Sequence, residues 1–412
     1  MTIREKFEIP KRYSLWSYAL IAVGVISVIL LYVTHGASND EHERARFWSS
    51  LLQNSVFFLL VVNAGMFFLC ATILAWGGWT TSFRRVSEAI ASAVPVIGVI
   101  CGVILLAIVF GNDHAIYHWA APEDHLDDIL KHKSGFLNKT FFTVWTVLTI
   151  TLWSLLGKKM RNLSLSTDER KMSVEEGKIF QWKNTVWSAL FLLVFALTVM
   201  STIPWLWLMS IDAHWYSTMY SWYTFASTFV SGVALIALFV IYLKNKGYLE
   251  YTNEEHLHDI GKFMFAFSVF WCYLWFSQYM LIWYSNQPEE TIYFIQRIGN
   301  AQHAGPYKGI FFFNLIINFV APILILMKKA PKRNYTMMTF MSVLIIFGHW
   351  VDFYQMVMPG TVKGNPHMSW YEFGIPLGFI GLIMWGVGRY LSKHPMVPKN
   401  HPFLKESIIH HT

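Results

Sequence analysis

Long apolar runs recur along the whole chain and are the first feature of its sequence. Crossing the hydrocarbon core of a membrane takes about 20 consecutive, mostly apolar residues. Ten runs reach that length, and in lipid each must form a helix, because a helix satisfies its backbone groups within one segment. The runs lie at about residues 13–35, 48–76, 89–111, 136–157, 184–209, 215–243, 258–285, 308–327, 335–358 and 371–391.

The composition supports this reading and excludes several classes of protein. Residues of the AVILMFWYC group make up 55% of the 412 residues, aromatic residues 17% and charged residues only 14%. Soluble globular domains carry about 25% charged residues. Nucleic-acid-binding domains, disordered chains and most soluble enzymes are therefore excluded. We expect an all-α polytopic membrane protein that is surrounded by membrane lipid and has no nucleic-acid partner.

The basic residues indicate how the chain is oriented in its membrane. If the N-terminus is cytoplasmic, 24 of the 32 Lys and Arg residues lie on the cytoplasmic side and 8 on the other side. Cytoplasmic loops of membrane proteins carry an excess of Lys and Arg. The net charge of +7 is therefore an orientation signal. It predicts a multi-pass protein of a bacterial inner (cytoplasmic) membrane with both termini in the cytoplasm.

A short internal repeat predicts how the ten helices are grouped. Its residues are Gly135, Phe141, Phe142 and Lys158-Lys159, which recur 170 residues later as Gly305, Phe311, Phe312 and Lys328-Lys329. Runs 4 and 8, which carry it, cross in the same direction, so the repeat is parallel. We expect two parallel-related four-helix bundles, runs 2–5 and 6–9, with runs 1 and 10 as flanking helices. The corresponding segments are residues 1–47, 48–209, 210–358 and 359–412.

Run 9 carries the clearest candidates for chemistry. Ionisable side chains inside a membrane are costly and often functional. His349 and Asp352 are three residues apart, so they share one face of a helix, in its outer third. A neutral His beside a carboxylate can accept a proton from a quinol hydroxyl. The alternative is a hydrogen bond between the two side chains that only holds helices together.

Further polar residues fall at the outer ends of neighbouring runs. With the pair in run 9 they predict an outer layer that transfers protons or binds quinol. Tyr, Trp and polar residues also gather at membrane interfaces without any such role, so an interfacial belt is the alternative. The residues of this outer layer, besides His349 and Asp352, are Asp113, His114, Asp212, His214, Gln278 and Tyr354.

A second polar group lies at the inner ends of runs 3 and 7. Arg84 and Glu88 precede run 3, and His258 and Asp259 begin run 7. These residues are candidates for proton uptake from the cytoplasm. Charges at helix ends also lie commonly among lipid headgroups, and that interpretation is favoured for Glu88 and Asp259.

The sequence has no motif for a bound redox centre. Its three Cys residues, Cys70, Cys101 and Cys272, fall inside apolar runs, and there is no CxxC or CxxCH. Only His349 lies well within a run, whereas a membrane haem b needs paired His ligands. We expect no metal site, no catalytic residue and no covalently bound cofactor in this chain. Haem and iron–sulfur centres are expected only in partner subunits.

The grouping of the runs, the outer polar residues and the absence of cofactor ligands together resemble the NrfD/PsrC-type family of membrane subunits. The Asn112-Asp113-His114 exit of run 3 and the Lys158-Lys159 linker agree with it. The resemblance covers essentially the whole chain. It is closest to the smaller of the two such membrane subunits in alternative complex III, a bacterial quinol:cytochrome c oxidoreductase.

The resemblance implies a role in a respiratory chain. Subunits of this family support menaquinol oxidation near the outer face or proton transfer across the membrane, and they anchor periplasmic redox subunits. Menaquinol is therefore a candidate ligand. The implied partners are a second, larger NrfD-like subunit, an iron–sulfur subunit and c-type cytochrome subunits, with a terminal cytochrome oxidase as a further candidate. This chain is then a subunit without a redox centre of its own.

Two other functions stay open from the sequence. A stand-alone proton-coupled secondary transporter also uses repeats, but its polar site usually lies near the middle of the bilayer. His349 and Asp352 are displaced outward, which favours the respiratory subunit. A purely structural scaffold subunit would need none of these polar residues for turnover.

Overall fold

The structure is a computed structural model and describes residues 5–111, 114–169, 171–300, 302–364, 366 and 368–411. These residues form helices and no β-strand, and ten helical segments are long and apolar enough to cross a membrane. The chain is thus a multi-pass membrane protein. The segments are Lys11–Gly36, Glu41–Leu74, Gly78–Phe110, Lys139–Asp168, Val174–Trp207, Met219–Asn245, Glu254–Ser285, Lys308–Leu326, Tyr335–Thr361 and Trp370–Lys393.

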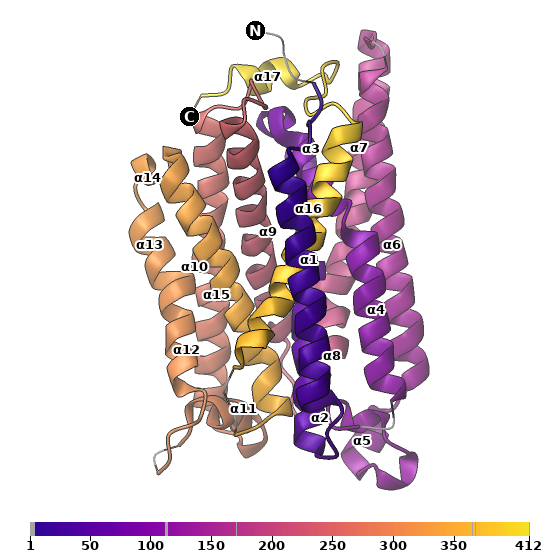
Figure 1. Ribbon diagram of the computed structural model, residues 1–412, viewed down its shortest axis with the longest axis vertical. Helices are drawn as coiled ribbons and strands as arrows, with labels where there is room; N and C mark the ends of the chain where they lie inside the picture. Colours follow the sequence, from indigo (N-terminus) through magenta and orange to yellow (C-terminus); the bar gives the residue numbers. More distant parts are fainter. Residues whose placement is uncertain are drawn as a thin grey trace.

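Several segments consist of more than one helix, and short helices lie between or beyond them (Figure 1). The helices are α1 (Lys11–Leu31), α2 (Glu41–Leu74), α3 (Arg84–Ala91), α4 (Val94–Phe110), α5 (Asp128–Lys133), α6 (Lys139–Leu165), α7 (Val174–Leu197), α8 (Ile203–Trp207), α9 (Met219–Asn245), α10 (Glu254–Ser285), α11 (Pro288–Ile298), α12 (Lys308–Leu315), α13 (Ala321–Leu326), α14 (Lys329–Arg333), α15 (Tyr335–Thr361), α16 (Gly374–Lys393) and α17 (Leu404–Ile408).

Each predicted run overlaps one spanning segment, but two helices begin well before their apolar residues. The helix α2 begins at Glu41 rather than 48, and α7 begins at Val174 rather than 184. The Asp40 side chain caps α2, and Ser173 with Glu176 forms a capping box for α7. Such polar turns extend a helix beyond the hydrocarbon, where hydropathy alone predicts a loop.

Two helices, α2 and α9, lie at the centre of the molecule and are buried along most of their length. The helix α2 packs against α4, α7, α9 and α15, and α9 packs also against α10 and α15. Around α2, α6 packs between α4 and α7. Beside α9, α10 packs against α13, and α12 packs against α15. The two central helices therefore join two groups of neighbouring segments.

The first and last spanning segments form a pair beside the central helices. The helices α1 and α16 lie against each other (Figure 1). A Cβ atom at Gly24 would lie 2.4 Å from the Cα atom of Gly378, and one at Gly381 would lie 2.8 Å from backbone atoms of α1. Glycines allow the same close approach in other pairs of membrane helices. The first and the last of the ten described spanning segments thus lie side by side.

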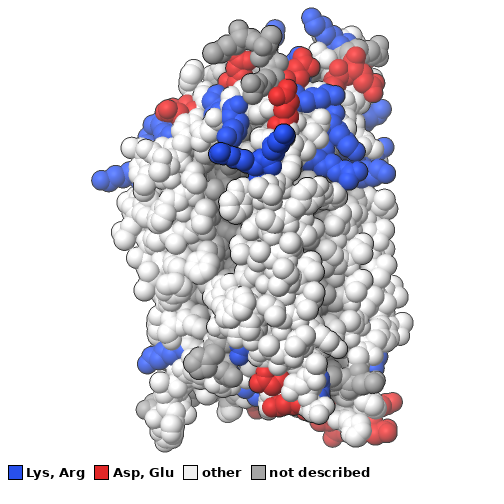
Figure 2. Space-filling view, viewed as in Figure 1, with Lys and Arg blue, Asp and Glu red and all other residues white. Residues whose placement is uncertain are grey.

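A wide band of the surface is free of charge. In Figure 2 the Lys, Arg, Asp and Glu residues gather at two ends of the molecule, and the surface between them shows almost none. Both termini lie at the end where most of the Lys and Arg residues of this view are found (Figures 1 and 2). We call it the terminal end and the other one the opposite end. The band is the surface that ten apolar helices present to hydrocarbon.

Candidate functional site

Asp352 lies in α15, without exposed surface, where four helices meet. Its Oδ1 atom accepts hydrogen bonds from the Tyr223 hydroxyl of α9 and from the Asn314 amide of α12, the latter at 2.7 Å. Its Oδ2 atom accepts one from the Trp271 indole of α10 at 2.9 Å. Three neutral donors thus hold the carboxylate. In the part of the chain that the structure describes, its one ion-pair contact is with a histidine, not with a Lys or Arg.

That histidine is His349, one helical turn before Asp352 on the same face of α15 and equally buried. Its Nδ1 atom lies 3.0 Å from the Ser227 hydroxyl oxygen and 3.8 Å from Oδ2 of Asp352. The Trp271 ring packs against the imidazole with the ring centres 5.4 Å apart. The Nε2 atom forms no hydrogen bond with the described residues. The structure therefore brings together the two residues of run 9 that their spacing had placed on one face.

Gln278 belongs to the same region, because it lines a small cavity together with two of the donors to Asp352. Arg297 lines this cavity too, although it was not among the candidates from the sequence. Its side chain is 1% exposed, and its Nε and Nη1 atoms donate to the backbone carbonyls of Gln355 and Tyr293. The guanidinium also lies 3.4 Å from the centre of the Tyr293 ring. The four-residue spacing of Tyr293 and Arg297 is the sequence signal that could have revealed this contact.

The structure does not bring the other outer candidates to Asp352. His214 is more than half exposed and pairs with Asp127, the residue that caps α5. Tyr354 donates from its hydroxyl to a backbone carbonyl in the loop after α15, at 2.9 Å. His114 lies in the loop after α4, and Asp113 lies outside the described residues.

Asp212 occupies an intermediate position. It is half-buried in the turn after α8, and its Oδ2 atom lies 2.9 Å from where a Cβ atom on Gly360 of α15 would be. Burial raises the pKa of Asp212, and the nearby positive charge of Arg297 opposes this shift. Asp212 thus lies against α15 without joining the hydrogen bonds around Asp352.

At the terminal end, Glu88 of α3 is fully buried in a cluster of charges. Arg84 donates to its Oε1 atom at 2.8 Å, Arg85 donates to Oε2 at 3.4 Å, and the Tyr390 hydroxyl of α16 donates to Oε2 at 3.2 Å. Arg85 also pairs with Asp168 at 2.7 Å. The interpretation of Glu88 as a headgroup charge is therefore wrong. Two guanidinium groups neutralise the carboxylate, and the helices can close over it.

Asp259 lies nearer to the surface and in a separate cluster. Its Oδ1 atom is 2.6 Å from the ammonium group of half-exposed Lys262, and its Oδ2 atom is 2.8 Å from Nε2 of His410. His258 is buried, with its Nδ1 atom 3.6 Å from Oδ1 of Asp259. Asp259 is itself buried, and its ionic partners are protein groups rather than lipid headgroups.

The C-terminal tail reaches both of these clusters, which the sequence did not indicate. The Nε2 atom of His401 lies 3.1 Å from Nη1 of Arg84, and His410 contacts Asp259. Between the two histidines, the Ser407 hydroxyl bonds to backbone groups of the turn before α3. The tail thus covers the terminal end from α3 to α10. Hydropathy does not mark such a segment, because it is held by a few polar contacts.

Acidification should loosen the contact of this tail. Burial and the nearby charges of Arg84 and Arg85 hold the pKa of His401 well below its ordinary value of 6.5. A released tail takes up a proton that the docked tail does not, so the docked state loses stability as the pH falls below about 6.5. Hydrogen exchange of residues 400–411, corrected for the intrinsic rate, should therefore rise between about pH 7.5 and about pH 5.5.

The variant His401→Gln is the control for this effect. It cannot take up the proton, so it should show much less of the change with pH. The contact of His410 with Asp259 is unchanged in this variant. Exchange that slows on acidification in the unchanged protein would contradict the role given to His401.

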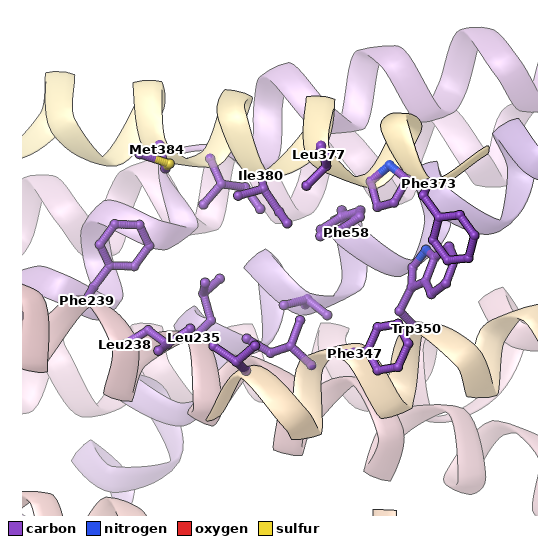
Figure 3. A pocket seen from close by; sticks show the side chains of 15 residues that line it. Phe58, Leu235, Leu238, Phe239, Phe347, Trp350, Phe373, Leu377, Ile380 and Met384 are labelled. Carbon is purple, nitrogen blue, oxygen red and sulfur yellow. The ribbon is translucent and has the colours of Figure 1, made fainter. Parts of the chain in front are cut away.

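A larger cavity opens on the uncharged band, between α2, α9, α15 and α16, and we call it the apolar groove. Its volume is about 470 Å³, and its surface is apolar throughout. Phe58, Leu235, Phe347 and Ile380 are among the side chains around it (Figure 3). A polar ligand group buried there would find no hydrogen-bond partner. The groove therefore suits a hydrocarbon chain.

No protein-family model and no curated protein matches this chain. Its function is therefore inferred from its own residues.

Proposed function

We propose that this chain is a membrane subunit of a respiratory quinol:cytochrome c oxidoreductase of the alternative complex III type, with Asp352 as its proton-transfer group. The observation that carries this proposal is the Asp352 carboxylate, buried among spanning helices and held by neutral donors. Ionisable groups in such a setting are costly and mark pathways for protons or ions. With no Lys or Arg paired to it among the described residues, Asp352 can gain or lose a proton without breaking an ion pair with a fixed cation.

His349 supplies a second proton acceptor beside this carboxylate. Its Nδ1 atom is 3.8 Å from Oδ2 of Asp352, a separation that a small shift of either side chain turns into a hydrogen bond. Imidazole can accept and donate protons near neutral pH. The pair therefore offers two neighbouring sites between which a proton can move.

The packing of the helices supports the proposed likeness to NrfD/PsrC-type subunits. We interpret α2, α4, α6 and α7 as one four-helix bundle, and α9, α10, α12 with α13, and α15 as the second, with α1 and α16 flanking them. The helices of each set are one another's neighbours. The many Lys and Arg residues of the terminal end in Figure 2 support cytoplasmic termini in a bacterial inner membrane.

We propose that menaquinol binds in neither of the two cavities described above. Its fused rings need both space and hydrogen-bond partners. The polar cavity beside Asp352 has a volume of about 20 Å³, which suits water, and the apolar groove has the space without the partners. We therefore assign quinol oxidation to the larger sibling subunit and proton transfer to this chain. The iron–sulfur and c-type cytochrome partners hold the redox centres.

Purification from native membranes in mild detergent tests this assembly. We expect the reduced preparation to show c-type haem in its visible spectrum. Mass spectrometry should find an iron–sulfur protein and a second, larger multi-span subunit in stoichiometric amounts. A colourless preparation of this chain alone would contradict the proposal. Assays in liposomes would then test the stand-alone proton-coupled transporter.

A further inference from the structure

The cavity beside Asp352 is lined by side chains of five helices. Its volume of about 20 Å³ exceeds the roughly 10–15 Å³ that one water molecule needs by this measure. Aromatic rings and Met356 form part of its wall. Its polar residues include Tyr223 of α9, Gln278 of α10, Arg297 of α11, Asn314 of α12 and Gln355 of α15.

Three of these side chains carry polar atoms without a partner although they are almost completely buried. They are Gln278, Gln355 and Arg297, which are 4%, 4% and 1% exposed. Nε2 of Gln278, Nε2 and Oε1 of Gln355 and Nη2 of Arg297 form no hydrogen bond with the described residues. Buried polar atoms are nearly always bonded to protein or to ordered water. Three N–H donor groups and one carbonyl acceptor around a space of this size match what water binds.

We infer that this cavity is a water-binding site and that its water connects Asp352 with the opposite end of the molecule. The water-binding site itself does not depend on the proposed function. The role of this water in proton transfer rests on that function. Gln278, Gln355 and Arg297 bind the water. Tyr223 and Asn314 line the same cavity and both donate to Oδ1 of Asp352.

The Tyr223 hydroxyl is the link between the water and the carboxylate. It can pass its proton to Asp352 while its oxygen accepts a proton from the water, and the reverse transfer returns a proton to the water. The water must first receive a proton from the opposite end, and the reverse transfer hands that proton back; Tyr223 and the water then regain their starting states, and only Asp352 has changed its protonation. Tyr223 is therefore a relay and not a store of protons.

Arg297 lies on the side of the cavity that faces the opposite end of the molecule. The helix α11 lies outside the spanning segments, at the opposite end (Figure 1). There Arg297 interacts electrostatically with Asp212 in the turn after α8. The fixed positive charge of Arg297 disfavours a proton that rests on the water. Asp212 lies against α15 at this end, and its carboxylate is the acceptor that we assign to a released proton.

Radiolytic footprinting of the purified protein tests the water site directly. Hydroxyl radicals that an X-ray pulse forms from a bound water oxidise the side chains that touch it. Met356 lines the cavity and is 3% exposed, whereas Met338 and Met341 of the same helix are 0% exposed and lie outside it. We expect Met356 to be oxidised at least about ten times faster than these two. Equal rates for the three methionines would overturn the inference.

The variant Gln355→Leu tests whether the Gln355 side chain binds the water. Losing one hydrogen bond worth about 1.4 kcal/mol weakens water binding by roughly tenfold, and the oxidation of Met356 relative to Met338 should fall accordingly. Gln53→Leu is the matched control, because Gln53 is a buried glutamine of α2 outside the cavity. A fall of the same size in both variants would overturn the assignment of Gln355.

Measuring proton release during turnover of the intact complex tests whether this water takes part in proton transfer. Gln355→Leu should slow proton release by up to about tenfold, in proportion to the lost water, and Gln53→Leu should leave it unchanged. Normal proton release together with a lost Met356 footprint would refute the proton role and leave the water site standing. A preparation without quinol turnover would refute the proposed function, and the footprint would still decide the water site.

Discussion

Asp352→Asn should lower the turnover of the assembled complex by roughly 100-fold, because a positioned proton-transfer group typically contributes a factor of that size or more. Asparagine has nearly the same shape as aspartate, so the four helices can still meet around it. Its amide does not take up and release a proton near neutral pH. Quinol-dependent reduction of cytochrome c and the accompanying proton release, measured in the purified complex, give the result.

The same substitution also has a structural effect that a second variant can separate. If the amide oxygen occupies the place of Oδ1, the amide nitrogen faces the N–H group of Trp271, which is a donor as well. A buried donor without an acceptor costs about 1–3 kcal/mol. Adding Trp271→Phe removes this conflict, so the double variant should regain thermal stability without regaining turnover.

Two outcomes would contradict the role of Asp352. Unchanged turnover and unchanged proton release in assembled Asp352→Asn would show that no proton passes through this carboxylate. Turnover restored by Trp271→Phe would show that the first substitution acted only through packing. Asp127→Asn serves as the control, because Asp127 lies in an exposed pair away from the site and its substitution should leave turnover unchanged.

Glu88→Gln should reduce the amount of folded protein rather than the turnover of each molecule. The substitution leaves the guanidinium groups of Arg84 and Arg85 buried with Asp168 as the remaining carboxylate partner. Removing one member of a buried ion pair costs about 3–5 kcal/mol, a large fraction of the stability of most proteins. The yield of monodisperse protein and the midpoint of thermal unfolding in detergent measure the effect.

A compensating variant shows whether charge is the cause. Arg84→Met added to Glu88→Gln removes the surplus positive charge, while Arg85 keeps Asp168 as its partner. The double variant should therefore be more stable than Glu88→Gln alone. If Glu88→Gln instead folds normally and loses turnover, Glu88 is a proton-uptake group and its role as a counter-ion is wrong.

The ten spanning segments could be predicted because every segment that crosses hydrocarbon must be an apolar helix of about 20 residues, whichever helices surround it. The common face of His349 and Asp352 follows from spacing within one helix in the same way. The donors to Asp352 could not be predicted by such a rule. Tyr223, Trp271 and Asn314 lie 129, 81 and 38 residues away in the chain. The residue pattern of one helix shows which residues share a face of that helix. It does not show which other helices pack against that face.

The burial of Glu88 shows a second limit of the same kind. A charge at the end of an apolar run looks the same in the sequence whether it lies among headgroups or inside a cluster. The difference is made by side chains from other elements, such as Asp168 beside Arg85 and Tyr390 on the carboxylate itself. Arg297 is a similar case, because its neighbours in the sequence do not reveal that α15 packs over it.

The tail that covers the terminal end also affects how the chain folds during its synthesis. Tyr390 follows Glu88 by 302 residues, and His401 follows Arg84 by 317. These partners are therefore synthesised only after the helices from α4 to α15. A nascent chain that has not yet reached them leaves the buried charges of α3 uncovered. Such a defect offers a membrane protease the means to recognise the chain.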